Sequence, residues 1–436
     1  MSSRIFYNSR SEAIQLGRRV GIGGEGTVYE ILGQSDLVAK IYHQTPPPEK
    51  AEKLIALSRL GADRLFNLSA WPVDVLRHQS LPADGGAPDG GANDNIIGFL
   101  MKKIGEAEEV HALHSPKSRL QKFPDASWAF LIYVAANIAR AVSVIHEHGY
   151  VVGDVNPKNI LVTRKATVFL LDCDSFQISV DGKTYRCEGG FPEYTPPELH
   201  GVTFKDVERN QAHDCFGLAV IIFQLLFLGR HPFSGRFLGV GEMPLERAIR
   251  EHRFAFGQDA VSRQMQPPPG TLALGAIPAS VNELFRRAFL SPHRPHAQDW
   301  IEPLESLAKS LKKCHLHTGH HFYQGLADCP WCELEMRARI RLFNFGVTTP
   351  NQNRGHFRLD EVWQEIENVA TANISQVLEP AAGNPSLPLV TTSEPARKFA
   401  EARHRRLYFA LCFSGLAGFL CGYAGGFCFG LLLELL

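Results

Sequence analysis

The sequence lacks a net charge, since its 45 Lys and Arg residues are balanced by 45 Asp and Glu residues. A chain without an overall basic field lacks the long-range attraction that draws a protein to nucleic acid. We therefore expect no nucleic-acid partner. The composition is otherwise that of a globular protein, with 44% hydrophobic and 21% charged residues, and the length suffices for two or three domains.

The sequence also lacks two marks of a secreted protein. Residues Met1 to Arg19 are polar and charged, without the apolar run of a signal peptide. The nine cysteines are scattered in three groups and do not form the dense framework of a small disulfide-bonded domain. We expect an N-terminus that stays in the cytosol and thiols that remain reduced.

Acidic and amide residues flank two short apolar runs in the middle of the chain. The runs Asn159–Val162 and Val168–Leu171 are separated by a short turn, which predicts a β-hairpin. Such a hairpin brings Asp154, Asn159 and Asp172 to one edge. Phosphoryl transfer requires a carboxylate that orients the attacking hydroxyl and oxygen ligands for Mg²⁺. An isolated pattern of this kind more often marks a β-hairpin with solvated Asp and Asn residues at its ends. The interpretation as a phosphoryl-transfer site therefore depends on the neighbouring motifs.

A glycine-rich pattern and a lysine-bearing strand precede this hairpin. The pattern G-x-G-x-x-G-x-V is formed by Gly21, Gly23, Gly26 and Val28. Glycines let the backbone approach phosphates closely, although a plain glycine-rich hairpin has the same appearance. The strand Val38–Ile41 follows at hairpin distance and resembles the V-A-I-K strand of protein kinases, which implies that Lys40 is the candidate ligand for the α- and β-phosphates of ATP. Taken alone, Lys40 would be read as an exposed strand lysine.

These motifs, in this order, resemble those of eukaryotic-type Ser/Thr protein kinases over residues 16–312. The resemblance implies an α+β, two-lobed protein-kinase-like fold that binds ATP and Mg²⁺ and acts on a protein substrate. It implies that Asp154 orients and deprotonates the acceptor hydroxyl while Asn159 and Asp172 hold Mg²⁺. Backbone groups near Met101 would meet the adenine.

The resemblance also implies an acid that pairs with Lys40 from the next helix. Three prolines, Pro46 to Pro48, predict a helix start, and Glu52 is the favoured partner of Lys40, with Glu49 as the second choice. Either acid is also explained by the general preference for negative charge in a first helical turn.

Further motifs extend the resemblance to the second half of the fold. Tyr194–Leu199 resembles the A-P-E segment of protein kinases, and His213–Leu226 resembles the following helix. The resemblance implies an ion pair between Glu198 and Arg294. Small-molecule kinases of the aminoglycoside and choline type lack the A-P-E segment, which argues against that class.

Two motifs depart from the kinase pattern. Val152 and Gly153 replace the usual His and Arg, while Cys173 and Asp174 replace Phe and Gly after Asp172. The missing arginine predicts activity without phosphorylation of the activation segment. The departures also motivate the alternative of a nucleotide-binding pseudokinase scaffold. Asp174 is an additional acid two residues after Asp172. The sequence leaves open which of these two carboxylates binds the metal.

A cysteine-rich segment follows the kinase-like region, where we predict a zinc-ribbon-like module over residues 313–336. Cys329 and Cys332 form a C-x-x-C turn, and Cys314 lies upstream among four histidines. Three thiolates and one imidazole would complete a tetrahedral Zn²⁺ site, although C-x-x-C also occurs in redox sites. The residues alone leave open which of these histidines ligates. The segment resembles bacterial kinase-like proteins of the helix-hairpin-helix and tellurite-resistance-associated group, and this resemblance favours His321 as the fourth ligand. No helix-hairpin-helix motif follows.

The C-terminal part predicts a membrane anchor. Residues 337–396 read as an amphipathic helix and a proline-containing linker, and residues 407–433 carry no charge over a length that spans a bilayer. Basic residues between 397 and 406 place the kinase-like region in the cytoplasm by the positive-inside rule. We therefore expect a single-pass protein of the inner (cytoplasmic) membrane.

Small residues recur every fourth position in this predicted transmembrane helix. They are Ser414, Gly418, Gly422, Gly426 and Gly430. Such a stripe lets two helices touch closely, which predicts a homodimer. Together the features predict a membrane-anchored Ser/Thr protein kinase in bacterial signalling, with a pseudokinase scaffold and a small-molecule phosphotransferase as alternatives.

Overall fold

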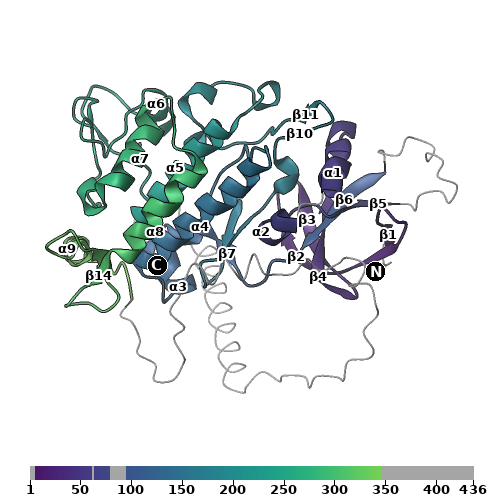
Figure 1. The fold of residues 1–436 in the computed structure, drawn as a ribbon, viewed down its shortest axis with the longest axis horizontal. Coiled ribbons are helices and arrows are strands. Elements are labelled where there is room, and N and C mark those ends of the chain that lie inside the picture. The colour runs from purple at the N-terminus through teal and green to yellow at the C-terminus, as the bar shows by residue number, and fades with distance from the viewer. Residues whose placement is uncertain (1–4, 61–62, 79–94, 345–436) are drawn as a thin grey trace, which may run out of the picture. The chain divides into compact units, whose positions relative to one another are not determined.

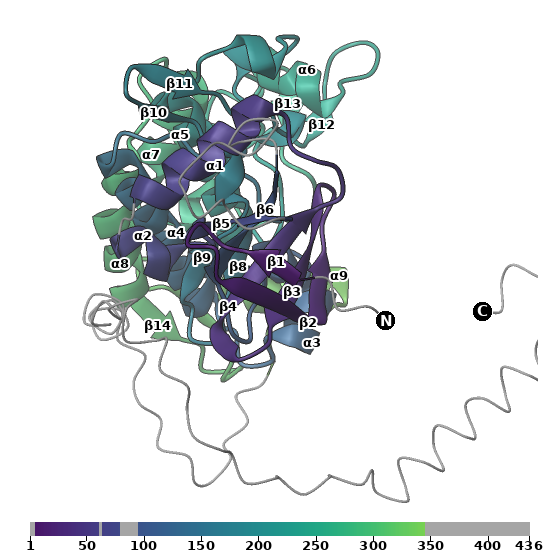
Figure 2. The same cartoon turned by 90° about the vertical axis from the view of Figure 1, so that its right-hand side faces the viewer.

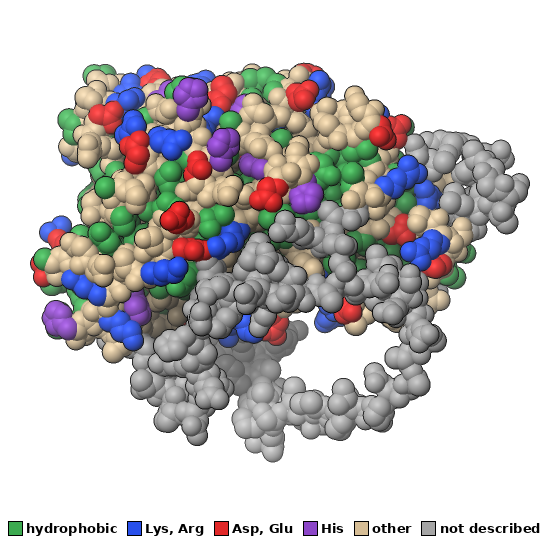
Figure 3. All heavy atoms as spheres, viewed as in Figure 1, with side chains coloured by type: hydrophobic (Ala, Val, Ile, Leu, Met, Phe, Trp, Pro, Cys, Tyr) green, Lys and Arg blue, Asp and Glu red, His purple; other side chains and the backbone are tan. Residues whose placement is uncertain are grey.

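The computed structural model describes residues 5–60, 63–78 and 95–344. Within them an N-terminal lobe built on strands adjoins a lobe rich in helices, as Figure 1 shows. The predicted amphipathic helix, the linker and the transmembrane segment at 407–433 lie outside the described residues. Charged side chains of both signs are interspersed over the face seen in Figure 3, in keeping with the balanced composition.

Six antiparallel strands of the N-terminal lobe close into a barrel in the order β1-β2-β3-β4-β6-β5. Their bounds are β1 Ile5–Tyr7, β2 Ala13–Ile22, β3 Gly26–Ile31, β4 Gln34–Tyr42, β5 Asp74–Arg77 and β6 Ile96–Lys102. Side chains alternate along a strand, so Ala39 fills the barrel interior while Val38 and Lys40 lie on the opposite face. The barrel includes β1, which precedes the predicted domain start at residue 16.

Helix α1, Pro48–Leu60, covers that opposite face of the barrel. It starts at the last of three consecutive prolines, which confirms the predicted helix start, and proline suits the first helical turn because its missing N–H needs no partner there. Ala51, Leu54 and Leu57 recur at helical spacing and are fully buried. Figure 2 shows α1 beside the strands of the barrel.

The second lobe is organised around helix α4, Trp128–Glu147, whose apolar residues are mostly buried. Helices α5, Gln211–Leu226, and α8, Ile301–Lys309, pack against it. Among the described residues α4 is the one helix long and apolar enough to cross a membrane, yet most of it is buried inside the fold. The remaining helices are α2 Asp63–Leu68, α3 Pro116–Lys122, α6 Leu245–Arg250 and α7 Ala279–Leu290.

The predicted acid-bearing hairpin is confirmed. Strands β8, Ile160–Val162, and β9, Val168–Leu170, pair antiparallel, and β7, Glu108–Glu109, adds a third strand. The backbone N–H of Leu171 donates to the carbonyl oxygen of Asn159 at 2.8 Å. This bond places Asn159 beside the residue that precedes Asp172. The other strands of this lobe are β10 Ile178–Val180, β11 Lys183–Tyr185, β12 Arg236–Phe237 and β13 Met265–Gln266.

A small module of β14, Leu311–Lys313, β15, His321–Tyr323, and α9, Pro330–Ala338, packs on the helical lobe. Its Trp331 ring meets those of Trp128 and Phe343, with centroids 5.2 Å apart in both pairs. The guanidinium of Arg119 on α3 donates to the carbonyl oxygen of Leu342 at 2.9 Å. The module and the lobe therefore share one apolar core.

Candidate active site and metal centre

Asp214 on α5 fixes the loop that carries Asp154. Its buried carboxylate accepts the backbone N–H groups of Val152 at 2.7 Å and Gly153 at 2.8 Å. Nε2 of His146 at the end of α4 lies 2.9 Å from the same carboxylate. The loop is thus held between two core helices. Neither His146 nor Asp214 was predicted to have this role from its sequence motif.

Asp154 and Asn159 lie together, as predicted. The side-chain amide of Asn159 donates to the Asp154 carboxylate at 3.1 Å and to its backbone carbonyl at 3.2 Å. Burial raises the pKa of the Asp154 carboxyl above its ordinary value. Hydrogen bonds from Asn156 and Asn159 lower this pKa, but burial outweighs them. A carboxylate with a raised pKa accepts a proton from a hydroxyl more readily.

Lys40 meets the acids that follow β9. Its ammonium lies 2.8 Å from a carboxylate oxygen of Asp172 and 2.8 Å from one of Asp174. Burial alone would lower the pKa of Lys40, but the carboxylates of Asp174 and Asp172 outweigh it and hold that pKa above its ordinary value. Lys40 is therefore a fixed positive charge on the face of the barrel that α1 covers.

The prediction that Glu52 pairs with Lys40 is wrong. The Glu52 carboxylate binds the ammonium of Lys183 on β11 and is partly exposed. The second choice, Glu49, is exposed in the first turn of α1. The reason is helical rotation: the residues of α1 that face inward near Lys40 are Lys50 and Lys53, not the glutamates.

The glycine-rich pattern forms the turn between β2 and β3. A Cβ atom at Gly26 would lie 2.6 Å from the carbonyl oxygen of Ile41, so strand pairing itself requires glycine there. Added Cβ atoms at Gly21 and Gly23 would meet nothing closer than 3.6 Å. The fold leaves space at these two positions, which fits a backbone that a phosphate approaches closely.

Apolar residues surround the place expected for adenine. Val28 on β3 and Leu171 just before Asp172 pack on the same apolar cluster as Met101, and Ile104 joins them. Met101 is buried at the end of β6. This set fits the flat apolar faces of a nucleobase.

Asp172 and Asn159 supply the oxygen atoms that Mg²⁺ prefers. The Asp172 side chain is 35% exposed, and its backbone has φ 56°, a left-handed conformation that Asp tolerates better than most residues. Its charge also contributes to the raised pKa of Asp154, so the two carboxylates interact. The donor set of carboxylate and amide oxygens fits Mg²⁺.

The segment from Asp172 to Leu199 is held by two arginines. Arg294 makes a two-pronged ion pair with Glu198, at 2.6 and 2.8 Å, which confirms the predicted pair. Arg209 donates to the backbone carbonyl oxygens of Gly153 and Gly189. Arg209 thereby connects the loop of Asp154 to the segment from Asp172 to Leu199.

Gly153 cannot be replaced by the arginine that the kinase pattern has at this position. Its φ is +78°, and an added Cβ would lie 2.5 Å from both Cβ and Sγ of Cys187. Cys187 is buried against the loop. The sequence departure at residue 153 is therefore matched by the packing around it.

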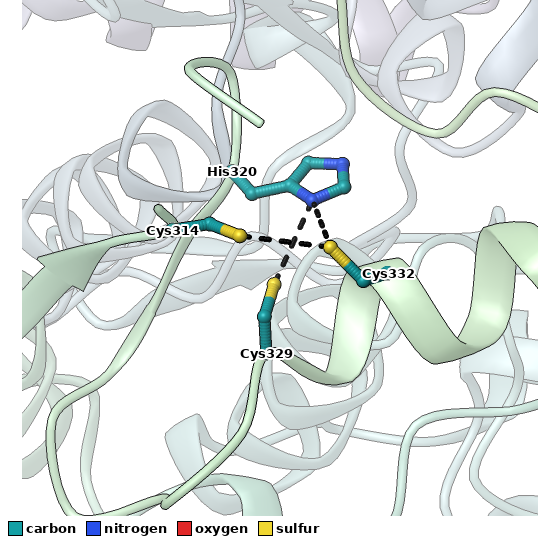
Figure 4. Close-up of side chains that lie close together, drawn as sticks. All are labelled: Cys314, His320, Cys329 and Cys332. Carbon is teal, nitrogen blue, oxygen red and sulfur yellow. Dashed lines mark hydrogen bonds between the residues drawn. The ribbon is translucent and has the colours of Figure 1, made fainter. Parts of the chain in front are cut away.

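Four side chains of the small module form a compact cluster, shown in Figure 4. Sγ of Cys314 lies 3.6 Å from Sγ of Cys332, and Nδ1 of His320 lies 3.6 Å from Sγ of Cys329 and 3.4 Å from that of Cys332. Metal–sulfur bonds of about 2.3 Å in a tetrahedron have edges of about 3.8 Å. The cluster therefore has the size and donor set of a four-coordinate zinc site.

The fourth member of this cluster is His320, and the prediction of His321 is wrong. Neighbouring residues of an extended strand point to opposite sides, so only one of these two histidines faces the thiols. The carbonyl oxygen of His321 accepts the indole N–H of Trp331 at 2.7 Å. Nε2 of His320 lies 3.3 Å from the Glu335 carboxylate, as in the outer shell of many metal-bound histidines.

Known proteins, a solved structure and a family model are similar to this chain. The chain is 38% identical over 429 residues to Protein kinase YegI of Escherichia coli (strain K12), covering 95% of this chain and 62% of that protein. It is 30% identical over 216 residues to a Probable cAMP-dependent protein kinase catalytic subunit of Encephalitozoon cuniculi (strain GB-M1), covering 49% of this chain and 60% of that protein. The chain thus spans less than two thirds of the length of these relatives.

Among solved structures, the chain is similar to that titled "ROP18 kinase domain in complex with AMP-PNP and sucrose", with a TM-score of 0.43 and 19% identity over 70% of this chain and 82% of that one. The family model described as Protein kinase domain matches residues 102–253. These residues include Asp154, Asn159 and Asp172, which lie together in the structure. Residues 102–253 of the chain therefore match a protein kinase domain model, and the arrangement of these three side chains agrees with that match.

Proposed function

We propose that this chain is a Ser/Thr protein kinase that transfers the γ-phosphate of ATP to a protein hydroxyl. The observation that carries the proposal is the convergence of Lys40, Asp154, Asn159 and Asp172 from three separate segments, namely β4, the loop before β8 and the end of β9. Charge placement and positioning supply most of the catalysis in phosphoryl transfer, so these four groups suffice for the reaction. The similarity to Protein kinase YegI supports the same class of activity.

Each residue has one task in this proposal. Asp154 accepts the proton of the attacking hydroxyl, and burial suits its carboxylate to that task. The amide of Asn159 holds Asp154 in orientation while its free oxygen, with Asp172, would bind Mg²⁺. Lys40 binds the phosphates, and Val28, Met101 and the backbone near them would hold the adenine. When bound by Asp172 and Asn159, Mg²⁺ would supply positive charge that stabilises the phosphate oxygens.

The first experiment is phosphate transfer from ATP labelled in its γ-phosphate, using the purified full chain in detergent. We expect label on Ser or Thr of protein, dependent on Mg²⁺ and lost in Asp154→Asn and Asp172→Asn. Asp125→Asn, at an exposed position in the same lobe, is the matched control and keeps full activity. Transfer that survives loss of Asp154 would refute the assignment.

A pseudokinase scaffold is the second candidate, favoured by the ion pair between Lys40 and Asp172. In that state each would-be ligand of the nucleotide or metal neutralises the other. ATP binding without any transfer, to protein or to small hydroxyl compounds, would support the scaffold. Transfer to a small compound alone would instead identify a small-molecule phosphotransferase.

We further propose that the cluster of Cys314, His320, Cys329 and Cys332 binds one structural Zn²⁺. Three thiols and an imidazole at these separations support that metal. Elemental analysis of the purified chain should give about one zinc per chain, a content that Cys332→Ser abolishes and that Cys215→Ser, at a buried cysteine of α5, leaves unchanged.

The uncharged segment 407–433 and the basic residues before it support anchoring in the cytoplasmic membrane with the kinase domain in the cytoplasm. The chain should sediment with membranes and resist extraction by high salt. The stripe of small residues supports a homodimer. Gly422→Leu should weaken association in detergent, whereas unchanged association would refute this interface.

A further inference from the structure

A fully buried carboxylate that the proposed mechanism does not use lies at the centre of the nucleotide end of the site. Asp174 has an exposed fraction of 0%. Its Oδ1 lies 2.8 Å from the ammonium of Lys40, and its Oδ2 accepts the hydroxyl of Tyr42 at 2.6 Å. The ammonium of Lys50 lies 3.8 Å from that same Oδ2. Asp174 is therefore tied to both β4 and α1.

The charged side chains that helix α1 turns toward Asp174 are all positive. Lys50 and the buried Lys53 come from its inward side, whereas Glu52 is turned to Lys183. The acid between these lysines and Lys40 must therefore come from another segment. Asp174, in the short 3-10 helix Cys173–Ser175, supplies it. A buried carboxylate between two ammonium groups compensates their positive charges, which would otherwise repel each other.

We propose that Asp174 positions Lys40 for the phosphates of ATP and replaces a glutamate of helix α1 in that task. The proposal rests on the proposed kinase function. Asp174 is a positioning residue, because it acts through Lys40 rather than on the substrate. The same carboxylate holds α1 through Lys50, whose ammonium also lies 2.6 Å from Glu25 in the glycine-rich turn. One acid thus connects β4, α1 and the turn over the phosphates.

The two acids after β9 differ in exposure, and we assign them different roles. Asp172 is 35% exposed and is free to turn toward a cation, whereas Asp174 is enclosed by Lys40, Tyr42 and Lys50. Oxygens of Asp172, Asp174 and Glu25 lie within 4.8 Å of one another. Because Asp174 already contacts two ammonium groups and a hydroxyl, we assign Mg²⁺ to the more exposed Asp172. In this assignment Asp174 stays the partner of Lys40 when Asp172 binds the metal.

The test is Asp174→Asn, which keeps the size of the side chain and removes its charge. We expect at least a tenfold weaker ATP affinity in direct binding and a tenfold higher KM for ATP in phosphate transfer by the full chain. Glu52→Gln is the matched control on α1 and leaves both within twofold. The decisive variant is Lys50→Glu combined with Asp174→Asn, which moves the acid onto the helix. It should recover most of the lost affinity, which a merely structural role of Asp174 would not produce.

The outcomes separate this inference from the proposed function. Wild-type protein that binds ATP without transferring phosphate refutes the kinase function, and the ATP affinities still test the role of Asp174. Unchanged affinity and KM in folded Asp174→Asn, or a loss in Glu52→Gln instead, overturn the inference. If Asp174→Asn does not fold, the double variant decides: near wild-type affinity supports the inference, and a loss above tenfold in the folded double variant overturns it.

Discussion

The buried lysine of helix α1 allows a quantitative prediction of stability. Lys53 is 6% exposed, and its ammonium donates to the carbonyl oxygen of Arg186 at 3.4 Å. Burial lowers the pKa of Lys53 from 10.5 to about 8, although nearby Cys187 and Asp174 oppose the shift. At neutral pH the protein therefore carries a poorly solvated ammonium inside the fold.

The lowered pKa sets both the size and the sign of the effect. The difference between 10.5 and about 8 corresponds to about 3 kcal/mol, at about 1.4 kcal/mol for each unit of pKa. Between these pH values the unfolded chain binds more protons than the folded chain, so the contribution of Lys53 to the free energy of unfolding rises with pH. Below pH 8 the full penalty is present.

Lys53→Met should remove this penalty. We expect the free energy of unfolding to rise by about 3 kcal/mol at pH 7, and the advantage to shrink toward zero as the pH approaches 10.5. The measurement is denaturant unfolding of the full chain in detergent, followed by tryptophan fluorescence at a series of pH values. Lys117→Met, at an exposed position of α3, is the control and should show neither change. Equal or lower stability of Lys53→Met at pH 7, or an advantage independent of pH, would refute the reasoning.

Three further predictions follow from the loop and the metal cluster. Gly153→Ala should destabilise the fold by at least about 2 kcal/mol in the same unfolding assay, because its left-handed backbone and the contact with Cys187 both oppose a Cβ. Phosphatase treatment should leave ATP-dependent transfer unchanged, since Arg209 binds backbone carbonyls rather than a phosphate; a loss of transfer would contradict this. His320→Ala should lose zinc by elemental analysis while His321→Ala retains it, and the reverse result would restore the sequence-based ligand.

The sequence by itself determined the local elements of the site. Two short apolar runs predicted the β8–β9 hairpin, three prolines predicted the start of α1, and the spacing of motifs predicted that Asp154 and Asn159 lie together. These features depend on the periods of strands and helices and on short turns, which neighbouring residues decide. The predicted membrane anchor at residues 407–433 is equally local, and it remains a prediction.

Only the tertiary structure decided which charges meet. Lys40 pairs with Asp174, which is 134 residues away in the sequence, rather than with Glu52 twelve residues away, because the rotation of α1 turns its lysines inward. In the same way the path of the chain just before β15 turns His320, and not His321, toward the thiols. A sequence pattern shows that a partner is needed, whereas the packing of separate segments determines which residue reaches it.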